Sequence, residues 1–148
     1  MEENKYATSF FVDGQLFAID TEAVRHILEN TRPTPVPLTK PFVSGIINNH
    51  GTMMPVLDLR KLLDRKPDDT LREQCIIIIG VEENGKEEMV GLKVDEMDDV
   101  FEYSPDDFKS DTVLDLTPEV HNAVAGTIKK ADNFVCLLKT NDLAAAML

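Results

Sequence analysis

His50 is the residue whose surroundings most invite a catalytic interpretation. It lies in the stretch GIINNHGTMMPVLD, residues 45–58, with asparagine and aspartate nearby. A histidine in such company can belong to an active site, and Cys75 or Cys136 could pair with it as nucleophile and base. Both cysteines, however, lie inside apolar runs, where burial raises the pKa of a thiol and makes it inert. The sequence therefore does not predict an enzyme, and the alternative is a hairpin whose tip docks onto another protein.

The other chemistry-bearing residues do not form a recognisable site. The sequence lacks a His-x-x-x-His pair, a Gly-x-Ser-x-Gly motif and a glycine-rich phosphate loop. Neither cysteine belongs to a Cys-x-x-Cys pair, so no metal or cofactor is predicted. Asp95 and Asp99 would share one face of a strand, but they lack metal-ligand spacing. A solvated strand edge accounts for these carboxylates.

Negative charge is concentrated in the middle of the chain. The net charge is −12, and residues 82–119 contain 14 acidic and 3 basic residues, a net charge of −11. Such a segment repels phosphate groups, which argues against nucleic acid or an anionic membrane as the main partner. We interpret it as a solvated face, with a docking surface for a basic partner as the sharper alternative.

The length and hydrophobicity indicate one cytoplasmic domain. The chain has 148 residues, of which 43% are hydrophobic, and this suits a single compact core. No apolar run approaches the roughly 18 residues that a membrane-spanning helix needs. The acidic N-terminus lacks an apolar targeting stretch, so we expect a cytoplasmic protein without membrane insertion.

Turn residues and apolar patterning predict a mostly β chain. Strands are expected at residues 9–12, 15–19, 45–48, 52–57, 74–81, 88–94, 97–103, 120–128 and 133–139. The run 74–81 is apolar on both faces and is expected in the interior of a sheet. Many short strands at brief intervals favour a small barrel or sandwich, or two barrels that share a core.

Three short helices are expected between these strands, at residues 21–29, 59–63 and 141–147. The first would present an apolar stripe made of Ala23, Val24, Ile27 and Leu28. Asp58 is expected to cap the second helix and Asn141 the third. Between the strands at 45–48 and 52–57, Asn48 is expected to bond its own backbone and Gly51 to need a positive φ.

Three blocks of the sequence resemble the CheW family of bacterial chemotaxis coupling proteins. The first is similar to the family pattern Pro-x-x-x-x-Gly-x-x-Asn-x-Arg-Gly-x-x-x-Pro-Val-x-Asp-Leu, here at Pro41, Gly45, Asn48, Gly51, Pro55, Val56, Asp58 and Leu59. The second covers residues 91–100, which resemble Gly-x-x-Val-Asp-x-Val-x-Asp-Val. The third, at 124–126 and 134–138, is a looser likeness. One difference stands out, because His50 occupies the place of the family arginine.

The resemblance implies both a fold and a function. Family members are single domains, here 1–148, of two small five-stranded SH3-like β-barrels. They are non-enzymatic adaptors that join the cytoplasmic tip of a chemoreceptor to the regulatory domain of the histidine kinase CheA. By position, the receptor-binding residues would be Val24, Ile27, His50 and Val100. The kinase-binding residues would be Gly45 and Ile47.

Substitutions follow from these assignments. Gly45→Asp is expected to place a charge in the kinase contact without unfolding the domain. We expect Val24, Ile27 and Val100 to line an apolar groove that takes a receptor helix. Histidine offers two donors where arginine offers five with a permanent charge, so His50 is expected to contribute less to receptor binding than this groove. A scaffold for a kinase pathway outside chemotaxis remains the main alternative function. A ligand-binding barrel and a hydrolase are the others.

Overall fold

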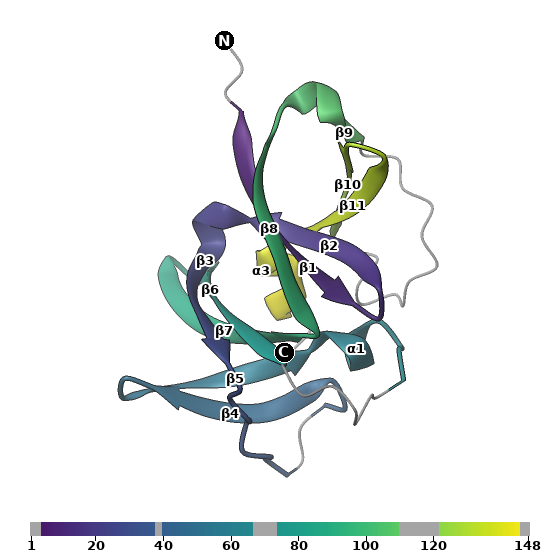
Figure 1. The fold of residues 1–148 in the computed structure, drawn as a ribbon. Helices are drawn as coiled ribbons and strands as arrows, with labels where there is room; N and C mark the ends of the chain where they lie inside the picture. Colours follow the sequence, from purple (N-terminus) through teal and green to yellow (C-terminus); the bar gives the residue numbers. More distant parts are fainter. Residues whose placement is uncertain (1–3, 38–39, 67–73, 110–121, 146–148) are drawn as a thin grey trace.

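The structure, a computed structural model, describes residues 4–37, 40–66, 74–109 and 122–145. Its strands form two sheets (Figure 1). The first sheet contains, in spatial order, β8 (Glu96–Tyr103), β1 (Lys5–Val12), β2 (Gln15–Asp20), β11 (Asn133–Leu138), β10 (Val124–Lys130) and β9 (Phe108–Lys109). The second contains β3 (Val24–Glu29), β6 (Cys75–Glu83), β7 (Lys86–Val94), β5 (Thr52–Asp58) and β4 (Val43–Asn49). The predicted all-β class is therefore confirmed.

Both sheets have the same arrangement of strands. Each is built on a central hairpin, β1–β2 or β6–β7, with an antiparallel edge strand beside it, β8 or β3. On the other side lies a parallel strand, β11 or β5, followed by an antiparallel one, β10 or β4. The first sheet adds the two-residue β9, and the second adds only a bridge between Thr34 and Ile46. The sheets thus have six and five strands, where five each were expected.

A single hydrophobic core joins the two sheets. Phe10 and Phe17 of the first sheet belong to the same buried cluster as Leu57, Ile77 and Leu92 of the second. All five side chains are fully buried, and each contributes roughly 1.5–3 kcal/mol of hydrophobic stabilisation. Each sheet also has a smaller buried cluster of its own. The two sheets consequently form one packed unit.

The two-faced run 74–81 has the predicted interior position. Strand β6 lies between β3 and β7, and Cys75 to Ile79 are all buried. Ile77 and Ile79 face the core shared by the sheets, whereas Ile76 and Ile78 face the cluster enclosed by the second sheet. Burial on both faces explains why this strand does not alternate between polar and apolar residues.

The prediction of a helix at residues 21–29 is wrong. Only η1 (Thr21–Ala23) is helical, and Val24–Glu29 is the edge strand β3, paired with β6. The apparent helical stripe has another cause, a β-bulge between Val24 and His26. A bulge adds one residue to a strand, so it places Val24 and Ile27 on the same face although they are three residues apart. The same spacing in a sequence is typical of a helix.

The other two helices lie close to their predicted positions. Helix α1 (Leu59–Leu62) begins after Asp58, and α3 (Thr140–Ala145) follows β11; residues 146 and 147 lie outside the described residues. Asn141 does not cap α3, because the helix already includes it. Its Oδ1 instead accepts the backbone N–H of Glu82 at 3.2 Å, which attaches α3 to β6.

Candidate functional site

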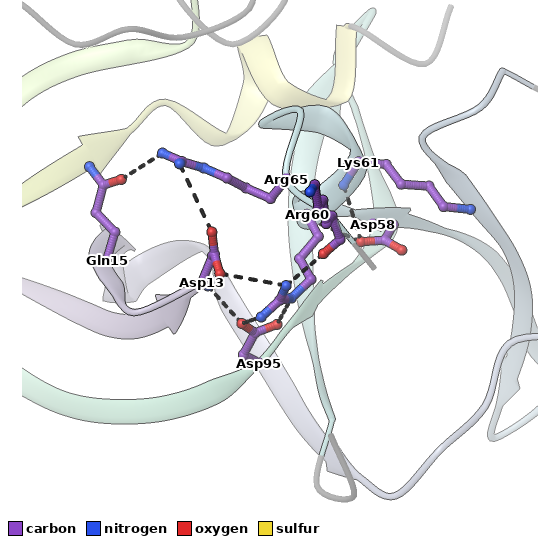
Figure 2. A network of polar contacts seen from close by, with 8 residues as sticks. Asp13, Gln15, Asp58, Arg60, Lys61, Arg65 and Asp95 are labelled. Carbon is purple, nitrogen blue, oxygen red and sulfur yellow. Dashed lines mark hydrogen bonds and ion pairs between the residues drawn. The ribbon is translucent and has the colours of Figure 1, made fainter. Parts of the chain in front are cut away.

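A network of ion pairs holds the two sheets together at one edge of their interface. Asp58 Oδ1 accepts the N–H of Arg60 at 3.0 Å, which fixes the first turn of α1. Arg60 then reaches Asp95, between β7 and β8, with Nε–Oδ1 and Nη2–Oδ2 distances of 2.7 and 2.6 Å (Figure 2). Asp95 Oδ2 also accepts the N–H of Asp13, in the β1–β2 turn, at 2.7 Å. Asp95 therefore connects the first sheet to α1 of the second.

Close to Asp95, where this network joins the two sheets, two edge strands from different sheets border one groove. At one end, Glu29 of β3 and Met97 of β8 line a pocket of about 200 Å³. At the other end, Glu22, just before β3, and Val100 of β8 line a pocket of about 510 Å³. Strands β3 and β8 therefore border these two pockets in antiparallel order, and we call the region between the two strands, with a pocket at each end, the inter-sheet groove.

Each of the two strands that border the inter-sheet groove contains a β-bulge. In β3 the bulge places Val24 and Ile27 on one face, opposite Ile79 and Ile77 of the shared core. The pairing of β8 with β1 shifts register in the same way, between Thr8 and Phe10. As a result Val100 pairs with Thr8, and Met97 pairs with Phe10.

Ile27, Val100 and Tyr6 leave much apolar surface uncovered at the groove. Ile27 is 43% exposed, Val100 53% and Tyr6 55%. Most large apolar side chains of the described residues are buried, so a concentration of exposed ones along one channel indicates a contact surface. Met97 and Tyr6 were not predicted as site residues. The three-residue spacing of Met97 and Val100, the same as that of Val24 and Ile27, is the signal that could have found Met97.

Polar contacts hold the wide end of the groove in shape. Thr8 Oγ1 and Thr21 Oγ1 are 2.9 Å apart and link β1 to η1. The hydroxyl of Tyr103 donates to Asp20 Oδ1 at 3.0 Å. Burial, reinforced by the negative charge of Asp20, raises the pKa of Tyr103, so its hydroxyl stays protonated as a donor.

His50 lies beside the opposite face of β3. It occupies the β4–β5 turn with φ 53°, and Gly51 follows with φ 85°, the two positive values of a type I′ turn. Asn48 Oδ1 accepts the N–H of Gly51 at 2.9 Å. The His50 ring is 6.3 Å from that of His26, which pairs with Ile78 on the side away from the inter-sheet groove. The structure thus separates His50 from Val24, Ile27 and Val100.

Gly45 and Ile47 are inside the fold rather than on its surface. Ile47 is only 5% exposed and packs in the cluster enclosed by the second sheet. Gly45 has φ +151° at a bulge of β4, and a Cβ there would lie 2.2 Å from the carbonyl oxygen of Thr34. The expectation that Gly45→Asp leaves the domain folded is therefore wrong, since any side chain would collide with backbone. Residues on the outer face of the hairpin are better probes of a contact.

The cysteines do not support nucleophilic chemistry. Cys75 is 8% exposed and Cys136 only 2%. Burial raises the pKa of Cys136 to about 12, which leaves very little thiolate at neutral pH. Within the described ranges, no group of three or more His, Cys, Asp or Glu residues is placed to hold a metal ion. Across the same residues, none of the helices has the length and apolar character to cross a membrane.

Comparisons with known proteins agree with this architecture. Residues 7–147 match the model of the CheW-like domain family. The chain is 36% identical over 114 residues to the chemotaxis protein CheW of Bacillus subtilis, covering 72% of this chain and 70% of the relative. It is 26% identical over 140 residues to the probable chemotaxis protein CheW of Rhizobium etli, covering 91% and 84%.

A solved structure has the same fold over nearly all of the chain. The scaffolding protein TtCheW from Thermoanaerobacter tengcongensis aligns with a TM-score of 0.79 at 25% identity, covering 94% of this chain and 90% of that one. The family match, the curated relatives and the fold thus agree along almost the full sequence, and the chain belongs to the CheW-like domain family.

Proposed function

We propose that this chain is a non-enzymatic adaptor that couples chemoreceptors to a CheA-type histidine kinase in bacterial chemotaxis. The observation that carries the proposal is the exposed apolar groove between two edge strands, in a chain whose relatives are chemotaxis scaffolds. The two sheets would act as one domain over residues 1–148, because they share a core. The adaptor would work in the cytoplasm, recruited to receptor arrays at the membrane.

The receptor would bind in the inter-sheet groove. Val24 and Ile27 on one wall and Val100 on the other offer apolar anchor points, which suit the apolar face of a helix from the cytoplasmic tip of a receptor. His50 would lie outside this contact, beside the far face of β3. We therefore assign the affinity to the groove and only a peripheral contribution to His50.

The kinase regulatory domain would bind the outer face of the β4–β5 hairpin. Gly45 and Ile47 would shape this surface from within, since Gly45 allows the close approach of Thr34 and Ile47 anchors β4 in the core. Met53, on the opposite side of the hairpin from Met54, is 57% exposed. An exposed apolar side chain on a short hairpin is a suitable anchor for a protein contact.

Met53→Asp tests this assignment without disturbing the core. We expect it to weaken binding of a CheA-type regulatory domain at least about 30-fold, as for a central apolar anchor. Phe134→Asp is the matched control, because Phe134 is 62% exposed on β11 of the other sheet. Titration calorimetry with both variants decides the question. Equal affinities for the wild type and Met53→Asp would remove the hairpin face from the kinase contact.

A further inference from the structure

Both ends of the inter-sheet groove carry carboxylates without ion-pair partners. Glu29 and Glu96 line the narrow end. Glu22 lines the wide end, and Glu102 lies there beside Tyr6, accepting only neutral donors. Among the described residues, none of these four carboxylates has a cationic group within 4.0 Å. By contrast, the carboxylates of Glu87, Asp95 and Asp98 are paired with Arg25, Arg60 and Lys130.

Nearby positive charge does not neutralise these ends. Arg25, on β3, directs its guanidinium to the Glu87 carboxylate and the backbone oxygen of Glu22. Lys5 lines the wide end, but Asp20 lines it too and offsets the charge of the lysine. Asp20 itself accepts a hydrogen bond from the neutral hydroxyl of Tyr103. Each end therefore keeps an excess of negative charge around an apolar channel.

We propose that the helix bound in this groove has an apolar stripe flanked at both ends by basic residues. This inference rests on the proposed receptor function and specifies the chemistry of that partner segment. The six residues of β3 span about 20 Å, since a strand rises roughly 3.3 Å per residue. A helix covers the same length in about 13 residues. The basic residues of the partner are thus separated by about 13 positions, with apolar anchors between them.

The pairing of these charges has a defined energetic role. Carboxylates at the rim of an interface are largely hydrated, so each new ion pair adds little affinity and is screened by salt. Complementary rim charges mainly accelerate association and select the orientation of the partner. Two carboxylates at each end favour a helix that is basic at both ends over one that is basic at a single end.

The experiment measures binding of a chemoreceptor cytoplasmic-tip fragment at low and high ionic strength. The test variants are Glu29→Gln with Glu96→Gln, and Glu22→Gln with Glu102→Gln. The matched control is Glu83→Gln with Glu88→Gln, which removes the same charge from the exposed β6–β7 hairpin. We expect each groove pair to weaken binding about fivefold to tenfold at low salt and hardly at all at high salt. The control should change binding less than twofold.

The outcomes separate this inference from the proposed function. If Ile27→Asp abolishes binding but the groove pairs have no larger effect than the control, the receptor function stands and the charged-end inference is overturned. An affinity of the wild type that is independent of ionic strength overturns it equally. If the wild type does not bind the tip fragment, the receptor function fails and the inference fails with it.

Discussion

Ile27→Asp is expected to abolish binding of a chemoreceptor tip while leaving the fold intact. Ile27 is 43% exposed on the groove side of β3, so a carboxylate there remains hydrated in the free protein. In the complex it would be desolvated against an apolar helix face, which is costly. Loss of a central anchor costs about 2 kcal/mol or more, an affinity at least roughly 30-fold weaker.

Val24→Asp and His50→Ala complete the test of the groove. Val24 is partly buried against the shared core, so Val24→Asp should abolish binding and also lower thermal stability. His50→Ala should change receptor affinity less than about threefold, because His50 lies on the other side of β3. Phe134→Asp controls for an exposed apolar residue elsewhere. Calorimetric titration that finds Ile27→Asp binding normally, with His50→Ala defective, would assign the receptor contact to the turn.

Asp95→Ala is expected to cause a large loss of stability. The side chains of Arg60 and Asp95 are only 13% and 11% exposed, and their contact is bidentate. The variant removes two charge-assisted hydrogen bonds from Arg60, each of a kind that contributes about 1.5–3 kcal/mol, while Arg60 keeps its hydrogen bond to the Lys66 carbonyl oxygen at 2.7 Å and the Asp13 carboxylate at 3.7 Å. Asp95 also accepts the N–H of Asp13, so the variant loosens the joint between the two sheets.

An exposed pair in the same molecule is the matched comparison. The side chains of Arg25 and Glu87 are 38% and 42% exposed, and exposed pairs contribute at most about 1 kcal/mol. Urea unfolding of Asp95→Ala and Glu87→Ala measures both losses under the same conditions. Similar losses for the two variants would contradict the structural role assigned to the Arg60–Asp95 contact.

Local signals in the sequence were sufficient for the hairpins and the central strand. Asp13-Gly14 and Asn84-Gly85 are two-residue turns with positive φ at both positions, which few other dipeptides adopt without strain. The two-faced apolar run 74–81 correctly indicated burial on both sides. These features depend on backbone preference and on burial of a single strand, so residues close in sequence carry the information.

The bulge of β3 and the contact of Arg60 with Asp95 depend on residues that are distant in sequence. A bulge between Val24 and His26 exists because β3 pairs with β6, some 50 positions away, and its three-residue spacing imitates a helix. Arg60 and Asp95 are 35 residues apart and meet only when the two sheets pack. His50 and His26, whose rings are 6.3 Å apart, are likewise distant in sequence. Spacing along one segment contains none of this information.

The repeated arrangement of the two sheets has one short signature in the sequence, at the bulges of β4 and β10. Gly45 and Gly126 occupy equivalent bulges, where a Cβ would lie 2.2 Å from the carbonyl oxygens of Thr34 and Lys109 respectively. Both glycines lie in the same short pattern, Val-x-Gly-x-Ile, at residues 43–47 and 124–128, with a glycine at the close approach and apolar residues on either side.

Simultaneous binding of both partners is the most direct test of the coupling function. A tip fragment of a chemoreceptor and the regulatory domain of a CheA-type kinase are mixed with this chain, and the molar mass of the complex is measured by light scattering after size exclusion. We expect one complex that contains all three proteins. The receptor fragment should be missing from it with Ile27→Asp, and the kinase domain should be missing with Met53→Asp. Two mutually exclusive binary complexes, or a kinase domain that never associates with this chain, would contradict it.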